Sequence, residues 1–144
     1  MTDAVRIWFK GCREMTDKDG FKWVRYSDLE AEKIVYTDES APFGDAVKTW
    51  TYTLVKVAEG LGAKDLLMTM CTLKPGEGVA HHSHPDQEEI YILVKGRSQV
   101  RTDREKVEAE AYSFFYFPPG CPHSVYNNST ESSDWLFVAS KPKE

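Results

Sequence analysis

The chain has few cysteines, no Cys-x-x-Cys pair and no long hydrophobic run. Its three cysteines, Cys12, Cys71 and Cys121, are odd in number and lie far apart, so they do not predict a disulfide framework. This usage is typical of a reducing compartment, and we expect a cytoplasmic protein. No apolar segment approaches the roughly 18 residues of a membrane span. Residues 1–14 lack the hydrophobic centre of a signal peptide, so we expect no membrane partner.

Lysine and arginine are spread along the chain, and no segment concentrates positive charge. The 144 residues carry a formal net charge of −5 at pH 7. Nucleic-acid binding usually shows itself as a basic patch or stripe, so we expect no nucleic-acid partner. The length suits a single domain with one hydrophobic core.

Short segments that favour strands follow one another along the chain, and helical patterns are scarce. Many alternate in polarity or are rich in strand-favouring residues, and turn residues separate them. They cover residues 5–9, 21–27, 47–57, 65–73, 79–84, 88–94, 98–103, 105–110, 113–117, 122–127 and 134–141. Residues 27–35 begin with a possible helix cap, Ser27 or Asp28, but are short. The pattern predicts an all-β sandwich or barrel.

Three of the four histidines lie close together, at His81, His82 and His84. If residues 79–84 form a strand, His82 and His84 share one face and His81 points the other way. Clustered imidazoles that are followed by carboxylates are what a transition metal needs. The histidine segment is therefore the first candidate for a metal site.

A carboxylate and a fourth histidine complete the candidate site. Residues 85–86, Pro-Asp, favour a turn, and the run after them is rich in residues that favour strands. A hairpin would bring His82, His84 and Glu89 together. His123 could supply a fourth ligand from a third strand.

Two motifs around these histidines resemble those of the cupins. The first has the spacing Gly76-x5-His82-x-His84-x4-Glu89-x6-Gly96. The second has the spacing Pro118-x-Gly120-x2-His123-x3-Asn127. The second motif departs from the family at its opening glycine, where this chain has Tyr112. That departure falls at a turn that enters a strand and affects no ligand.

The resemblance implies a cupin-type double-stranded β-helix, or jelly roll, with a metal inside the barrel mouth. It covers roughly residues 66–140 and implies the ligands His82, His84, Glu89 and His123. Glu88 is the neighbour that could be confused with Glu89, but only Glu89 has the motif spacing to Gly96. His81 is expected to point away from the metal.

Outside the resemblance, residues 1–60 match no family that we can identify. We expect them to add strands, or an arm that packs on the barrel or on a partner, while residues 61–144 form the cupin barrel of one structural domain. This segment is rich in large aromatic residues: Trp8, Phe9, Phe21, Trp23 and Trp50. These side chains could belong to the core or to a homodimer interface, and we expect a homodimer.

Three imidazoles and one carboxylate suit one divalent transition metal such as iron, manganese, nickel or zinc. Four protein ligands on a six-coordinate ion leave two positions for substrate, or for substrate and dioxygen. We expect a metal-dependent enzyme that acts on a small-molecule substrate, with a dioxygenase-type reaction favoured. The alternatives are an isomerase, epimerase or lyase, and a non-catalytic ligand-binding or sensor protein, because this fold hosts many chemistries.

Tyr91 and Glu89 are the candidate catalytic residues. They share a face of the run 88–94, so the Tyr91 phenol should line the cavity, where it could act as acid or base or orient substrate. An apolar wall could come from Met68 and Met70 or from Phe115 and Phe117. Other expectations are a buried Cys71, a Cys121 that could approach the site, a solvated turn at Asp86 and Gln87, exposed Arg97 and Arg101, and core positions for Trp135 and Phe137.

Overall fold

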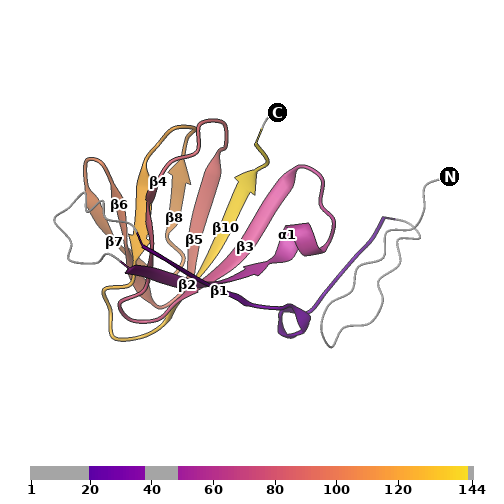
Figure 1. Ribbon diagram of the computed structural model, residues 1–144, viewed down its shortest axis with the longest axis horizontal. Coiled ribbons are helices and arrows are strands. Elements are labelled where there is room, and N and C mark those ends of the chain that lie inside the picture. The colour runs from indigo at the N-terminus through magenta and orange to yellow at the C-terminus, as the bar shows by residue number, and fades with distance from the viewer. Residues whose placement is uncertain (1–19, 38–48, 143–144) are drawn as a thin grey trace.

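Two antiparallel sheets form the body of the protein (Figure 1). The computed structural model describes residues 20–37 and 49–142. Its strands are β1 (Glu32–Thr37), β2 (Thr49–Lys56), β3 (Leu66–Leu73), β4 (Gly78–His82), β5 (Glu89–Lys95), β6 (Arg97–Thr102), β7 (Lys106–Glu110), β8 (Phe114–Phe117), β9 (His123–Tyr126) and β10 (Ser133–Ser140). The helical segments are the 3-10 helix η1 (Tyr26–Asp28) and α1 (Val57–Gly60). Within these described ranges, neither has the length or hydropathy of a membrane span.

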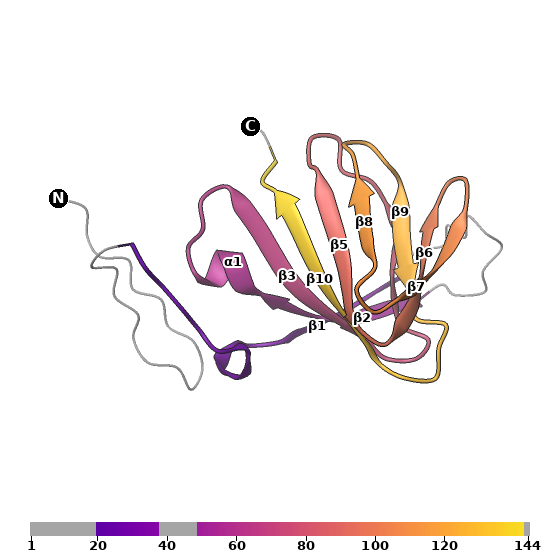
Figure 2. The same cartoon turned by 180° about the vertical axis from the view of Figure 1, so that it is seen from behind.

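The strand order confirms the predicted all-β fold. One sheet has the order β1-β2-β3-β10-β5-β8, and the other has the order β4-β9-β6-β7. From β3 to β6 the chain alternates between the sheets, and it does so again from β7 to β10. Figure 2 shows the six-stranded sheet as a fan with the four-stranded sheet beside β8. This back-and-forth path is the jelly roll, or double-stranded β-helix.

The core lies between the inner faces of the two sheets. Residues that are directly opposite on paired antiparallel strands share a face. One such row on the six-stranded sheet is Leu54, Cys71, Trp135 and Leu93. The last three are fully buried, and Val100 and Val125 pack against them from β6 and β9. Burial of one leucine-sized side chain contributes about 1.5–3 kcal/mol, so these rows hold the two sheets face to face.

The strand expected at residues 21–27 is wrong, because residues 21–25 have no regular structure and Tyr26–Asp28 form η1. The residue that caps η1 is Arg25, and neither Ser27 nor Asp28 caps a helix; residues 27–35 hold the end of η1 and the start of β1. Figure 1 shows residues 20–31 running away from the barrel. The Arg25 guanidinium lies 4.8 Å from the centroid of the Trp23 ring.

Other parts of residues 1–60 join the barrel. β1 and β2 extend the six-stranded sheet beyond β3. Trp50 on β2 is only 3% exposed and makes an edge-to-face contact with Tyr126, so it is a core residue. The predicted strand at 5–9, with Trp8 and Phe9, lies outside the described residues, as does Cys12. An arm that packs on a partner stays a prediction.

Two positive-φ turns position the strands that carry the site. Gly96, between β5 and β6, has φ +84°, and a Cβ there would lie 2.5 Å from the carbonyl oxygen of Ser132. Tyr112 occupies the turn before β8 with φ +67°. This is the position at which the second motif has glycine. Left-handed backbone costs a side-chain-bearing residue about 1–2 kcal/mol, so the turn keeps its geometry at the expense of strain.

We therefore expect Tyr112→Gly to stabilise the protein. Tyr112 is 74% exposed, so little packing is lost, while the strain at φ +67° is relieved. Part of that gain is offset by the greater freedom of glycine in the unfolded chain, which leaves a net increase of roughly 0.5–1 kcal/mol in the free energy of unfolding. Denaturant titration measures this change. The matched control is Tyr112→Ala, which removes the ring but keeps the Cβ; an equal gain with alanine would show that the backbone is not strained.

Candidate metal centre

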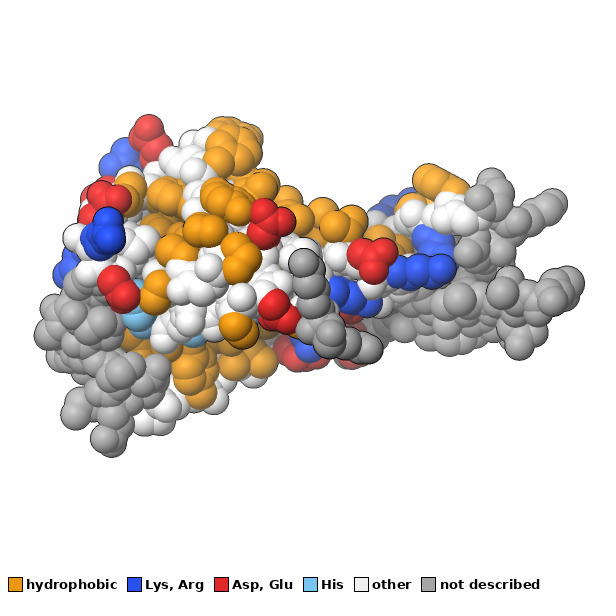
Figure 3. Space-filling view, turned by 90° about the horizontal axis from the view of Figure 1, so that it is seen from above, with side chains coloured by type: hydrophobic (Ala, Val, Ile, Leu, Met, Phe, Trp, Pro, Cys, Tyr) orange, Lys and Arg blue, Asp and Glu red, His pale blue; other side chains and the backbone are white. Residues whose placement is uncertain are grey.

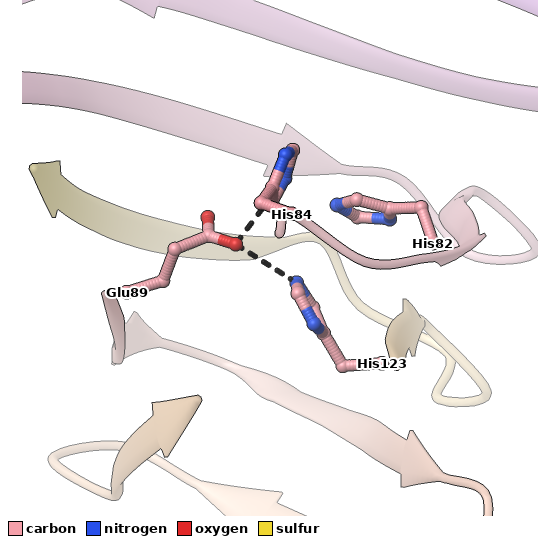
Figure 4. Close-up of side chains that lie close together, drawn as sticks. All are labelled: His82, His84, Glu89 and His123. Carbon is pink, nitrogen blue, oxygen red and sulfur yellow. Dashed lines mark ion pairs between the residues drawn. The ribbon is translucent and has the colours of Figure 1, made fainter. Parts of the chain in front are cut away.

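Three histidines and one glutamate meet at one end of the barrel (Figure 4). His82 ends β4, His84 follows two residues later, Glu89 begins β5 and His123 begins β9. One donor atom from each lies within 4.8 Å of the others. An ion bound at about 2.0–2.2 Å holds its ligand atoms within roughly 4.4 Å of one another. If the four donor atoms moved slightly closer together, these side chains would hold a metal ion.

β4 and β5 do not form the hairpin that the sequence suggests. β4 pairs with β9 in the four-stranded sheet, and β5 lies between β10 and β8 in the other. The predicted turn at residues 85–86 is present, but it belongs to a connection between the two sheets. His84 lies in this connection rather than on a strand. The ligands converge because the sheets face each other, and because His82 and His123 are directly opposite across β4 and β9.

The main chain fixes the orientation of two of the imidazoles. His82 Nδ1 lies 2.7 Å from the carbonyl oxygen of Ala80, and His123 Nδ1 lies 2.9 Å from that of Cys121. A carbonyl oxygen only accepts, so each Nδ1 carries the proton and donates it. The Nε2 atom of each neutral ring then carries a lone pair that can bind a metal ion or accept a hydrogen bond. Metal-binding histidines typically show this arrangement.

The contacts of Glu89 require positive charge at the centre of the cluster. Its Oε1 lies 3.3 Å from His84 Nε2 and 3.2 Å from His123 Nε2. A carboxylate oxygen and an unprotonated nitrogen repel at that distance unless a proton or a cation lies between them. Because Nδ1 of His123 already holds the neutral ring's proton, either a second proton or a metal ion satisfies this contact. The donor set therefore fits a divalent metal.

Aromatic rings hold His123 in place. The ring of Phe117 stacks on it with centroids 4.1 Å apart and planes 10° apart. The Tyr91 hydroxyl lies 3.0 Å from His123 Nε2, so it donates to that atom while the imidazole is neutral. Phe137 stacks on the Tyr91 ring at 3.8 Å. His123 is 1% exposed, and these contacts leave it little freedom to turn.

Burial and charge shift the protonation of the site in the direction that favours a metal. Burial, aided by the nearby charges of His123 and His84, lowers the pKa of His82 below its usual value. Burial alone would raise the pKa of Glu89, but its hydrogen bond with His123 and the surrounding histidine charges outweigh this and lower it. Both shifts favour the deprotonated forms that bind metals.

Burial, and next the charge of Glu89, raises the pKa of the Tyr91 hydroxyl well above its usual value. Tyr91 therefore keeps its proton at neutral pH and is a hydrogen-bond donor.

A cavity of about 270 Å³ opens beside the cluster. His82, His84 and Glu89 form its polar side. The other described lining residues are Tyr52, Leu54, Leu67, Thr69, Val79, Gln87, Tyr91, Phe137 and Ala139. No lysine or arginine is among them. Figure 3 likewise shows histidine atoms at the surface between hydrophobic side chains.

The structure decides which apolar side chains face the site. Met68 and Met70 lie on the outer face of β3, since Leu67 and Thr69 line the cavity. Phe117 faces inward and contacts His123, as described above, while Phe115 packs on Trp135. Trp135 is a core residue as expected, and Phe137 packs against the core as expected but also lines the cavity.

Two polar residues that were expected at the surface are buried. Gln87 is 9% exposed, because its Nε2 donates to the carbonyl oxygen of Ser140 at 2.8 Å and its side chain borders the cavity. Arg101 is 4% exposed, because it donates to Gln99 and lies over the ring of Tyr126. Both expectations were wrong because a partner in another part of the fold satisfies each side chain.

The neighbouring candidate ligands lie outside the cluster. His81 Nε2 is 2.6 Å from Asp103 Oδ1, and Glu88 accepts a hydrogen bond from the hydroxyl of Tyr116. Cys121 approaches the site through its carbonyl group rather than its thiol. Cys71 is a buried thiol as expected, and burial raises its pKa.

Tyr52, Leu54 and Thr69 are cavity residues that sequence analysis did not assign. Alternation along residues 47–57 does place Tyr52 and Leu54 on one face. The direction in which that face points is set by the pairing of β2 with β3, which the local pattern does not contain.

Comparison with known proteins supports the resemblance to the cupins. The family model described as "Cupin domain" matches residues 69–139. The protein is therefore a small cupin-domain protein. Two curated proteins resemble parts of the chain. "Polyketide synthase CurC" of Streptomyces cyaneus is 30% identical over 86 residues, and this match covers 57% of this chain and 56% of that protein. An uncharacterised protein of Methanocaldococcus jannaschii is 39% identical over 46 residues, and this match covers 32% of this chain and 37% of that protein. The chain thus spans about half or less of these relatives.

Solved structures support the same fold. A predicted oxalate decarboxylase from Thermotoga maritima superposes with a TM-score of 0.67 and 22% identity, covering 83% of this chain and 98% of that chain. A sugar phosphate isomerase of the cupin superfamily from Silicibacter pomeroyi superposes with a TM-score of 0.69 and 17% identity. The superposition covers 83% of this chain and 76% of that chain. At these identities the likeness shows the fold alone.

We expect His82→Ala to abolish stoichiometric metal binding without unfolding the barrel, because it removes one of four converging donors. The metal affinity should fall by at least about a hundredfold, because removal of a group that only hydrogen-bonds to a ligand already costs about 10–100-fold. Elemental analysis after loading with metal and dialysis measures it. The matched control is His81→Ala, which removes the neighbouring imidazole and its contact with Asp103 but no member of the cluster, and it should keep one metal per chain. If His82→Ala retains the metal, or His81→Ala loses it, the ligand set is wrong.

Proposed function

We propose that the protein is a metal-dependent enzyme that acts on a small, largely uncharged molecule, with a dioxygenase-type reaction. The observation that carries the proposal is the opening of the His/Glu cluster into an apolar cavity of about 270 Å³. Ligand sites in proteins are typically concave and mostly apolar, with a few convergent polar groups. The volume favours a compact substrate.

The charges around the cavity support a substrate that is neutral or carries little negative charge. Glu89 would offset about half of the charge of a bound divalent ion, and the described lining residues include no lysine or arginine. A dianion would therefore enter the site with part of its charge unpaired, which is costly. The names of the oxalate decarboxylase and the sugar phosphate isomerase imply anionic ligands, so we propose that this site differs from theirs in substrate class. A neutral ring or enol would instead pack against Phe137, Leu54 and Tyr52.

Each residue of the cluster has a proposed role. His82, His84, Glu89 and His123 would hold one divalent ion, such as iron, manganese, nickel or zinc. When bound, that ion supplies Lewis acidity or oxygen activation at the positions that the protein leaves open. Tyr91 keeps its proton and donates a hydrogen bond beside His123, which orients a substrate oxygen there. Phe137 and Leu67 exclude water from the same space.

The small number of free bases in the cavity lining favours the dioxygenase-type reaction over the alternatives. An isomerase, epimerase or lyase needs a protein base that accepts a substrate proton. Among the described lining residues, the histidines and Glu89 belong to the metal cluster, and Tyr91 is a hydrogen-bond donor beside His123. An oxygenation needs the open metal positions and an apolar cavity, but no phenolate. The isomerase or lyase remains the second candidate, because Glu89 could still serve as the base.

Oxygen uptake distinguishes these reactions. Protein made without an affinity tag is loaded separately with Fe(II), Mn(II), Ni(II) or Zn(II), and each form receives uncharged diketones, catechols and enols. We expect substrate loss matched by oxygen consumption in one redox-active metal form, and no turnover without oxygen. Equal conversion under nitrogen would establish an isomerase or lyase. Saturable binding without conversion in any metal form would establish a ligand-binding protein.

Tyr91→Phe tests the proposed donor role. We expect kcat to fall by about 10–100-fold, because one buried hydrogen bond to the reacting group is worth roughly 1.5–3 kcal/mol. Metal content should not change, since the backbone carbonyl of Cys121 still orients His123. Tyr116→Phe makes the same chemical change on the opposite face of the sheet and should leave kcat unaltered. An unchanged kcat in Tyr91→Phe, measured with the substrate found above, would remove Tyr91 from the mechanism.

A further inference from the structure

Strands β1 and β2 contact β4, the strand that ends in a metal ligand, although they belong to the other sheet. Trp50 on β2 packs so closely on Gly78 of β4 that a Cβ there would lie 2.9 Å from the tryptophan ring. Thr51 Oγ1, also on β2, donates to Glu77 Oε2 just before β4 at 2.9 Å. Both strands precede residues 69–139, which match the cupin-domain model. A part of the chain outside that match therefore supports β4.

β4 contains an irregularity immediately before His82. Its pairing with β9 places Val79 opposite Val125 and His82 opposite His123. Between these pairs, two residues of β4 correspond to one residue of β9, which is the count of a β-bulge. With a regular ladder His81, not His82, would stand opposite His123. The bulge therefore decides which of the two neighbouring histidines faces the cluster.

Ala80 lies in this bulge and is only 3% exposed. Buried backbone N–H groups are almost always paired, yet a bulge disrupts the ladder that would normally pair them. The Ala80 N–H donates to the hydroxyl oxygen of Tyr36 on β1 at 2.6 Å. Tyr36 thereby supplies, from the other sheet, an acceptor for a buried group in the bulge.

The carbonyl group of Ala80 orients His82. It accepts the Nδ1 proton of His82 at 2.7 Å, which leaves Nε2 to face the cluster. Ala80 is thus held by Tyr36 at its N–H group while it holds His82 at its carbonyl group. A displacement of Ala80 would shift or turn the imidazole.

Neighbouring aromatic rings hold Tyr36 in position. Strand pairing places it directly opposite Trp50, which is 3% exposed. Its ring makes an edge-to-face contact with Tyr52 at 6.0 Å between centroids, and Tyr52 lines the cavity. Aromatic pairs of this geometry are favourable. A packed ring, rather than a freely moving side chain, therefore presents the hydroxyl group to Ala80.

We propose that Tyr36 is a positioning residue of the metal centre: it holds the bulge in β4 and thereby directs His82, rather than His81, at the metal. Groups that orient a metal ligand typically contribute about 10–100-fold to metal affinity. The proposal rests on the metal site of the proposed function, and it depends on neither the reaction nor the substrate.

Metal titration of Tyr36→Phe tests this role. The variant keeps the ring and its packing but removes the acceptor of the Ala80 N–H. We expect the dissociation constant of Co(II), measured by competition with a chelator, to rise about 10–100-fold, with circular dichroism unchanged. The ligand-field absorption spectrum of bound Co(II) should also change, because one imidazole is displaced. An unchanged affinity and spectrum in the folded variant would overturn the proposal.

Thr51→Val is the matched control. It removes another hydrogen bond between the same pair of strands and the β4 region, the one to Glu77, but leaves the bulge intact. We expect it to keep the Co(II) affinity and the Co(II) spectrum of the wild-type protein. An equal loss of affinity in Thr51→Val would show that β1 and β2 act only through overall stability, which also contradicts the proposal.

The metal-free protein distinguishes a failure of this proposal from a failure of the proposed function. If the wild-type protein binds no metal, the proposed function fails, but the orientation of His82 can still be measured. Nitrogen NMR at slightly alkaline pH should place the proton of wild-type His82 on Nδ1. In Tyr36→Phe we expect a mixture of the two tautomers, because a displaced Ala80 carbonyl no longer selects one nitrogen. A purely Nδ1-protonated His82 in this variant would show that Ala80 needs no help from Tyr36.

Discussion

The alternation of side chains along β5 determines what the rest of the protein can do. Glu89, Tyr91 and Leu93 point inward and supply in turn a charged ligand, a hydrogen-bond donor and a core contact. A shift of one residue would turn all three to the outer face. Their register depends on β10, which pairs with β5 on one side and β3 on the other. The fully buried Trp135 on β10 therefore helps to place Glu89 within reach of the histidines.

The electrostatics of the site follow from that placement. Burial would ordinarily protonate a carboxyl group such as Glu89, and the three imidazoles reverse this tendency. The same burial keeps the proton on Tyr91, two residues along the strand. A carboxylate and a neutral phenol thus stand side by side because only one of them has compensating positive charge. This difference assigns binding to Glu89 and hydrogen-bond donation to Tyr91 in the proposed function.

Local patterns in the sequence were sufficient to predict the all-β fold, and the resemblance to the cupin motifs predicted the four clustered side chains. Alternation separated His81 from His82, and the motif spacing to Gly96 separated Glu88 from Glu89; only the predicted members of each pair lie in the cluster. The hairpin was wrong because local spacing cannot distinguish strands that pair from strands that face each other across a core. Gln87 and Arg101 were wrong because their partners, the carbonyl of Ser140 and the ring of Tyr126, lie far along the chain. Residues 21–25 alternate in polarity, but they pair with none of the described strands, and alternation alone does not supply a partner strand.

Two of the histidines are oriented by backbone carbonyl groups, those of Ala80 and Cys121. A point substitution at either position keeps its carbonyl, so the orientation of the imidazole does not depend on any particular side chain there. The lining of the cavity can then change residue by residue, for instance at Leu54 or Phe137, while the ligand geometry persists. Such a division allows evolution to explore new substrates around a constant metal site, which gives a physical reason why one barrel can serve many reactions.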